Sequence, residues 1–138
     1  MTEQTHGMPS RALSSVAAVI VAAEGVGLGV LAVWELIALI GGDTDSAVSS
    51  IALLVLTGIG AVIVLGFAAG IARGRSWARS GGIVAQLLIL AVALGAATGQ
   101  YAHPLTGLAL AIPAVAALVL LILVARAAGR GRSADADR

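Results

Sequence analysis

Residues 47–79 read AVSSIALLVLTGIGAVIVLGFAAGIARGRSWAR, a run of 26 uncharged residues followed by a short segment with three arginines. An apolar run of about 20 residues is long enough to cross the hydrocarbon core of a bilayer as a helix. The stretch therefore predicts a transmembrane helix over 47–72 that ends in an arginine-rich loop on one side of the membrane.

Further apolar stretches lie on both sides of this segment. Hydrophobic residues make up 59% of the 138-residue chain and charged residues 11%, whereas a soluble domain is about a quarter charged. Short connections make consecutive helices antiparallel neighbours, so we expect one all-α domain, an up-down-up-down transmembrane four-helix bundle. Pro113 should kink the last helix. The predicted helices are 10–40, 47–72, 81–98 and 105–128, and the expected disordered tails are 1–9 and 129–138.

The arginines predict the orientation of this bundle. The chain contains eight arginines and no lysine. The arginines lie before the first predicted helix, between the second and third, and after or at the end of the fourth, whereas the other two connections contain none. Arginine flanks stay in the cytoplasm during insertion, so we expect both termini to be cytoplasmic. The lysine-free, Ala- and Gly-rich composition suggests a high-GC bacterium, and hence its cytoplasmic membrane. The arginines expected to contact anionic lipid headgroups are Arg73, Arg75, Arg79, Arg126 and Arg130.

Two carboxyl groups lie within the first predicted helix. Glu24 falls near the bilayer midplane, where an ionisable side chain is a candidate functional site. Glu35 is eleven residues further on, which returns it to within about 20° of the same helix face. Gln86 is predicted at a similar depth and could donate its amide to Glu24. These three residues form the candidate proton or polar site.

Two interpretations of this site stay open. In one, Glu24 binds a proton or cation and Glu35 lies at the outer mouth of a coupled site. In the other, a protonated Glu24 is hydrogen-bonded to a neighbouring helix, and Glu35 is an interfacial residue beside Trp34. Thr57 is expected to bond its own backbone carbonyl.

Several glycines have the spacing of helix-packing motifs. Gly25 and Gly29 are four residues apart beside Glu24, and Gly66 and Gly70 repeat this spacing in the second span. Small residues allow helix backbones to approach closely in lipid. We expect these four positions to pack helices, within the chain or between copies.

Other classes of function find little support in the sequence. The chain has no cysteine, which excludes thiolate chemistry and cysteine-bound metals. Asp43, Asp45 and His103 could gather in the outer turns, but turn formation explains aspartates there equally well. With no plausible catalytic set and few aromatic residues for base stacking, we expect no enzyme activity, cofactor, metal or nucleic-acid partner.

The segment RGRSWARSGGIVAQLL, residues 73–88, resembles a stretch of small four-span integral membrane proteins of high-GC bacteria. The shared features are a Trp-Ala-Arg core, here Trp77 to Arg79, and an early Gln in the next span, here Gln86. The resemblance implies four spans and a membrane location. The function of that group is unassigned, so it implies no mechanism.

The stretch Ala23-Glu24-Gly25 is also similar to the membrane glutamate of the small multidrug resistance exporters. The chain lacks the aromatic-rich helices of that family, and its strong charge bias argues against dual-topology insertion. We therefore expect a non-enzymatic accessory or structural subunit, packed with itself or a larger membrane complex. The alternative is a small proton-coupled transporter or channel component that uses Glu24.

Overall fold

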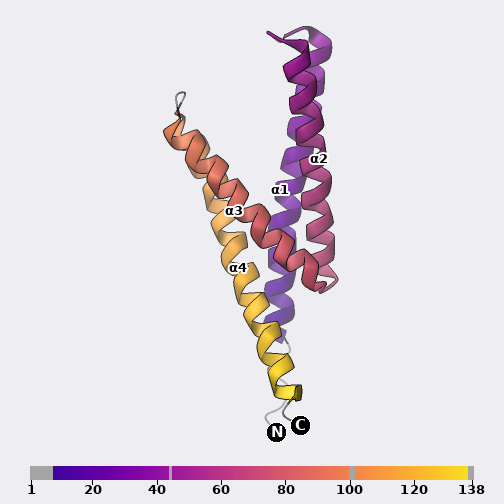
Figure 1. Ribbon diagram of the computed structural model, residues 1–138, viewed down its shortest axis with the longest axis vertical. Coiled ribbons are helices and arrows are strands. Elements are labelled where there is room, and N and C mark those ends of the chain that lie inside the picture. Colours follow the sequence, from indigo (N-terminus) through magenta and orange to yellow (C-terminus); the bar gives the residue numbers. More distant parts are fainter. Residues whose placement is uncertain (1–7, 44, 100–101, 137–138) are drawn as a thin grey trace.

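A computed structural model describes residues 8–43, 45–99 and 102–136. Every regular element in these ranges is a helix (Figure 1). Each helix contains a segment that is long and apolar enough to cross a membrane, which indicates a multi-pass membrane protein. The helices are α1 (Met8–Gly41), α2 (Ala47–Ala72), α3 (Ser76–Thr98) and α4 (Pro104–Ala136).

Three helices extend beyond their predicted ranges. Helix α3 begins five residues before the predicted position 81, because the turn between α2 and α3 needs only the short segment around Gly74, whose φ is +71°. Ala and Arg are good helix formers, so the polar stretch that follows continues as helix. For the same reason α4 runs to Ala136, and the prediction of disorder is wrong for residues 129–136. Helix α1 likewise includes Met8 and Pro9; residues 1–7 and 137–138 lie outside the described ranges.

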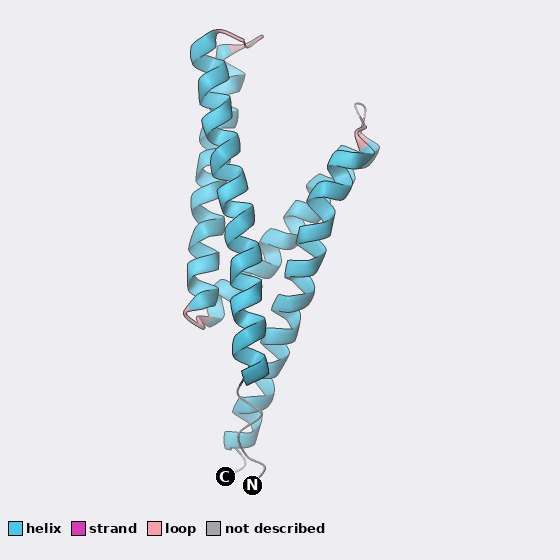
Figure 2. Cartoon of the chain, turned by 180° about the vertical axis from the view of Figure 1, so that it is seen from behind, coloured by secondary structure: helices cyan, strands magenta, loops and turns pink. Residues whose placement is uncertain are grey.

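The helices associate as two hairpins. Helix α1 packs along α2, and α3 packs along α4. The hairpins meet near the α2–α3 turn and diverge toward the turns that end α1 and α3 (Figures 1 and 2). The arrangement is therefore more open than the predicted four-helix bundle.

All four helices contribute to one common core, and most of its side chains are small. Ala78 is fully buried, and a Cβ atom added at Gly70 would overlap its methyl group. A Cβ at Gly82 would lie 3.1 Å from Leu121 and 3.3 Å from Ile71. Close approach at small residues thus holds the hairpins together at this end. The core comprises Ala17, Ala18, Val21, Val64, Ala68, Ile71, Ala78, Ala117 and Leu121.

Candidate functional site

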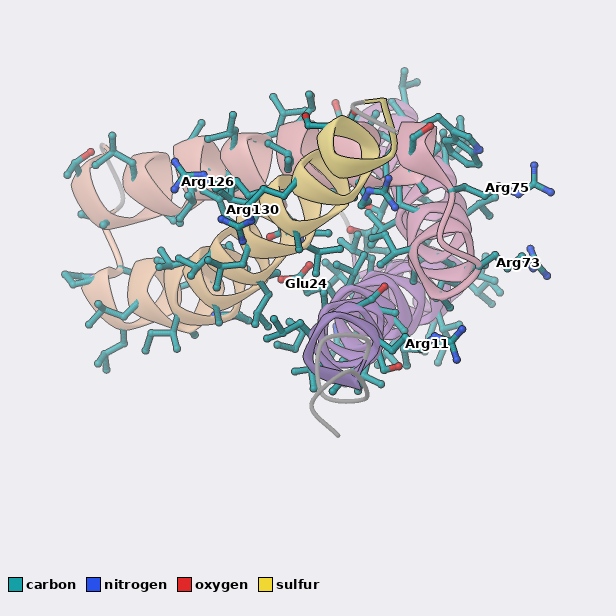
Figure 3. All side chains as sticks on the ribbon, turned by 90° about the horizontal axis from the view of Figure 1, so that it is seen from below. Arg11, Glu24, Arg73, Arg75, Arg126 and Arg130 are labelled. Carbon is teal, nitrogen blue, oxygen red and sulfur yellow. The ribbon has the colours of Figure 1, made fainter. Side chains whose placement is uncertain are left out.

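The structure brings two of the three predicted polar-site residues together across the hairpins. Glu24 lies on α1 and Gln86 on α3, and the Gln86 Nε2 group donates a hydrogen bond of 2.5 Å to Glu24 Oε2. Gln86 is fully buried and Glu24 is partly buried. Figure 3 shows Glu24 pointing from α1 toward the other hairpin. This hydrogen bond is a polar link between the two halves of the molecule.

Each residue of this pair also has a buried oxygen without a hydrogen-bond partner. These atoms are Glu24 Oε1 and Gln86 Oε1. A buried acceptor that has no donor costs free energy, because it has lost its hydrogen bonds to water. Buried polar atoms of this kind call for a structural or functional explanation. One carboxyl oxygen of Glu24 thus accepts a hydrogen bond from Gln86, whereas the other carboxyl oxygen and the Gln86 amide oxygen accept none.

A cavity of about 620 Å³ lies beside Glu24, between the hairpins. The α1 residues of its lining lie on one face of the helix, because they recur every three to four positions from Val19 to Leu31. Among the described residues that line it, Glu24 is the one with an ionisable side chain. The lining residues are Val19, Ile20, Ala23, Glu24, Gly27, Leu28 and Leu31 of α1, Ile89 of α3, and Leu110 and Pro113 of α4.

Glu35 does not join this site. The Thr57 hydroxyl of α2 donates to Glu35 Oε1 at 3.2 Å, and Glu35 does not line the cavity beside Glu24. The expectation that Thr57 bonds its own backbone is therefore wrong. Glu24 and Glu35 share a face of α1, but the second hairpin diverges from α1 toward the α1–α2 turn (Figure 1). Glu35 lies six residues before the end of α1 at Gly41, and its hydrogen-bond partner is on α2.

The four glycines predicted to pack helices divide into two pairs. A Cβ at Gly25 would lie 2.8 Å from the Leu65 side chain, and one at Gly70 would overlap Ala78, so both are close-contact positions. A Cβ at Gly29 or Gly66 would meet no atom within 4 Å. Gly29 and Gly66 therefore do not pack against another described helix of this chain, and of the two alternatives only packing between copies stays a prediction for them.

The arginines predicted to contact lipid lie in different surroundings. Arg73 and Arg75 are exposed and point outward on the α2 side, and the exposed Arg126 and Arg130 lie on the α4 side (Figure 3). Arg79 is partly buried, and its Nη1 group donates to the Gly74 carbonyl at 3.0 Å. Arg79 therefore also stabilises the turn before α3.

The candidate metal ligands of the outer turns are separated by the divergence of the hairpins. Asp43 and Asp45 lie beside the α1–α2 turn, and His103 lies just before α4, at the end of the other hairpin (Figure 1). In the ranges that the structure describes, no three acidic, His or Cys side chains come together as a metal site. The structure does not bring these three residues together.

The cavity and the Glu35–Thr57 pair were missed at the level of sequence. The stripe of residues from Val19 to Leu31 that lines the cavity has the spacing of any lipid-facing helix face, so its pattern carries no distinct signal. The sequence feature that indicates the cavity is the small size of Ala23 and Gly27, which leave space on both sides of Glu24 along that stripe. Gly27 has no atom within 4 Å of an added Cβ, which makes it a position where the cavity can be filled.

Comparisons of the chain with protein-family models, with curated proteins and with solved structures found no significant match. The resemblance of residues 73–88 to small four-span bacterial membrane proteins therefore stays a prediction. The classification of the chain therefore rests on its helices. Four segments capable of crossing a bilayer indicate a multi-pass membrane protein.

Proposed function

We propose that this chain is a multi-pass protein of the bacterial cytoplasmic membrane that acts as a non-enzymatic accessory or structural subunit of a membrane assembly. The observation that carries the proposal is the divergence of the two hairpins (Figure 2), which leaves their inner faces, beyond the common core, without a partner among the helices that the structure describes. The open positions at Gly29 and Gly66 add support, because glycines allow another helix to approach closely. The partner is a second copy or another membrane protein.

Native mass spectrometry of the protein released from nanodiscs tests this proposal. We expect a species heavier than the single chain of 13.6 kDa. Gly66→Leu should shift the population toward the single chain, because Gly66 has the helix-packing spacing with Gly70 and a side chain there would block the close approach of a second helix. Gly60→Leu is the matched control, since it is also open and lies about 120° away around α2. A single chain under all gentle conditions contradicts the assembly role.

The proposed orientation places both termini in the cytoplasm. It is supported by the arginine distribution and by the start of α1 and the end of α4, which lie at the same end of the molecule (Figure 1). The absence of cysteine from the sequence makes a clean test possible. In intact spheroplasts, an impermeant maleimide should label Asp45→Cys, but it should label Ser133→Cys only after the membrane is opened. The reverse pattern contradicts the orientation.

We further propose that the exposed arginines contact anionic lipid headgroups. Each arginine near an anionic surface contributes about 1 kcal/mol. Lipid adducts in native mass spectra should therefore favour phosphatidylglycerol over phosphatidylcholine, and Arg126→Gln with Arg130→Gln should reduce this preference. Equal adducts of both lipids contradict the contact.

The cavity favours a second candidate function, a small proton-coupled transporter or channel component that uses Glu24. The supporting observation is that Glu24 borders this space and has one unpartnered carboxyl oxygen. In proteoliposomes, pH-dependent flux of substrate through the wild type should be lost in Glu24→Gln and kept in Glu35→Gln. Absence of flux from the wild type across substrate classes would sink this candidate and leave the accessory role intact.

A further inference from the structure

The cavity between the hairpins offers almost no polar contact to an occupant. Glu24 borders it, but the Oε1 atom of Glu24 is buried and the Oε2 atom already accepts the hydrogen bond from Gln86. The other lining residues that the structure describes are aliphatic side chains, glycine and Pro113, so the accessible surface of the walls is almost entirely carbon. Because a water molecule needs polar partners in such a space, the occupant has to be apolar.

The cavity is long, and it is open to the membrane. Its wall on α1 runs from Val19 to Leu31, which is about 18 Å along the helix axis, whereas a hydrocarbon core of about 30 Å gives each leaflet about 15 Å. Val19 and Leu31 are 67% and 48% exposed, so the cavity is not sealed at either end of this wall. The hairpins diverge toward the α1–α2 and α3–α4 turns (Figure 1), so lipid of the leaflet on that side can enter between them.

The volume of the cavity decides between a helix and a thinner occupant. A helix with its side chains is about 10 Å across, so a helix lying along the α1 wall would need about 1,400 Å³. The cavity provides about 620 Å³. An empty cavity is also unfavourable, because the atoms of its walls would lose their dispersion contacts. A single flexible hydrocarbon chain meets both conditions, whereas a helix of a second copy does not fit.

We propose that this cavity binds one acyl chain of a membrane phospholipid. The chain enters from the leaflet on the side of the α1–α2 and α3–α4 turns, which is the outer leaflet in the proposed orientation. It lies along the α1 wall, where the small Ala23 and Gly27 make room for it, and its end lies near Val19, next to Ala18 of the common core. The bound chain fills the angle between the hairpins and so supports their separation.

This site goes beyond both functions proposed above. It lies within a single copy of the chain, so it does not depend on assembly. It also needs no charge on Glu24, since neither carboxyl oxygen is free to contact the acyl chain. Glu24→Gln should therefore retain lipid like the wild type, whereas the transporter candidate requires that this variant lose coupled flux.

The test is native mass spectrometry of the full-length protein released from dimyristoylphosphatidylcholine nanodiscs, with activation raised until loosely bound lipids are removed. Phosphatidylcholine is the probe because its zwitterionic headgroup gives the arginines no net negative charge to bind. We expect one lipid per chain to remain on the wild type. Absence of any retained lipid from the wild type would overturn the proposal.

A pair of glycine variants tests whether the retained lipid is in the cavity. Gly27→Leu places a side chain across the path of the acyl chain and should lower retention about fivefold or more. Gly29→Leu is the matched control, because it adds the same side chain about 160° away around α1, outside the cavity, and should retain lipid like the wild type. Neither added Cβ meets another atom within 4 Å, so both variants should fold, as judged by an unchanged elution volume. Equal retention by the two variants would place the lipid elsewhere and refute the site.

A shorter lipid separates binding of the acyl chain from binding of the headgroup. Dioctanoylphosphatidylcholine has the same headgroup, but its chains are too short to follow the whole α1 wall, so it should be retained several-fold less than the dimyristoyl lipid. Equal retention of the two lipids would show that the headgroup is bound, and the proposal would be wrong.

Photochemical attachment locates the chain directly. A phosphatidylcholine with a diazirine at the end of one acyl chain should, on illumination of the retained complex, attach to Val19, Ala23 or the facing Ile89 at the deep end of the cavity. Peptide mass spectrometry identifies the attachment sites. Attachment only to side chains outside the cavity, such as the 62% exposed Val92 of α3, would contradict the proposal.

Discussion

The two ends of this molecule differ in how their helices meet. At the end near the α2–α3 turn, all four helices share a core of small side chains that includes Ala17, Ala78 and Ala117. Toward the other end the hairpins diverge, and large side chains such as Ile37 and Leu94 are exposed, at 64% and 66%. Lipid tails are as apolar as these side chains, so burying them against another helix brings little gain. Close packing at small residues, rather than hydrophobicity, therefore decides where these helices meet.

The polar contacts follow the same division. Glu24 and Gln86 form their hydrogen bond across the hairpins, beside the cavity, whereas Glu35 and Thr57 form theirs within one hairpin, toward the divergent end. The packed end thus sets the distance between the hairpins. Glu24 lies where the hairpins begin to separate and the cavity opens between them. Substitutions at one end at a time test this difference.

The largest effect is expected at a fully buried side chain of the packed end. Leu121→Ala should lower the free energy of unfolding by about 2–3 kcal/mol, because Leu121 contacts the common core and its removal leaves a cavity there. Ile112→Ala on the same helix, where the side chain is 68% exposed, should change it by less than about 0.5 kcal/mol. The measurement is unfolding by SDS in mild micelles, followed by tryptophan fluorescence. Equal effects of the two variants would contradict a core confined to one end.

A glycine pair tests close approach directly. Gly70→Ala should cost about 1–3 kcal/mol of unfolding free energy, because the new methyl group overlaps Ala78 at the contact between α2 and α3. Gly29→Ala has open space around it and should be neutral or stabilise the protein by up to about 1 kcal/mol, since alanine is the better helix former. The same unfolding assay measures both. A matching loss at Gly29 would show that this face is also packed.

The hydrogen bond between hairpins should contribute less than the packing. Gln86→Leu keeps a fully buried side chain of similar size but removes the donor to Glu24, and should cost about 1–2 kcal/mol. In the Glu24→Gln background the same change should cost less, because a neutral partner loses less when its donor is removed. A double-mutant cycle measures this difference. A coupling of zero would mean that the two side chains do not interact in the folded protein.

Much of the fold could be predicted because lipid imposes simple rules on sequence. The uncharged run from Ala47 to Ala72 is the clearest case, since the helix coincides with the predicted range. The start of α3 and the end of α4 could not be placed, because span limits mark where the membrane ends and not where the helix ends. Trp77, Arg79 and Arg130 are polar or interfacial residues that still form helix well.

The site was partly predictable for a similar reason. A buried carboxyl needs a polar partner at its own depth, and this requirement was enough to pair Glu24 with Gln86. The cavity and the separate role of Glu35 depend on the angle between the hairpins. That angle arises from contacts between helices distant in sequence, such as α1 with α4, which share the core that contains Ala17 and Ala117, and periodicity does not reveal such contacts.

The smallest effect is expected at the polar contact of the divergent end. Thr57→Val keeps the shape of the side chain but removes the donor to Glu35, and should cost about 0.6 kcal/mol of unfolding free energy. The cost should fall below that of Gln86→Leu because Glu35 lies only six residues from Gly41, where its membrane segment ends, so water and headgroups can replace the lost hydrogen bond. Glu24 lies deep in the same segment, where such replacement is much less accessible. A cost at Thr57 equal to that at Gln86 would show that depth does not distinguish the two carboxyl groups, and the special position of Glu24 beside the cavity would then rest on shape alone.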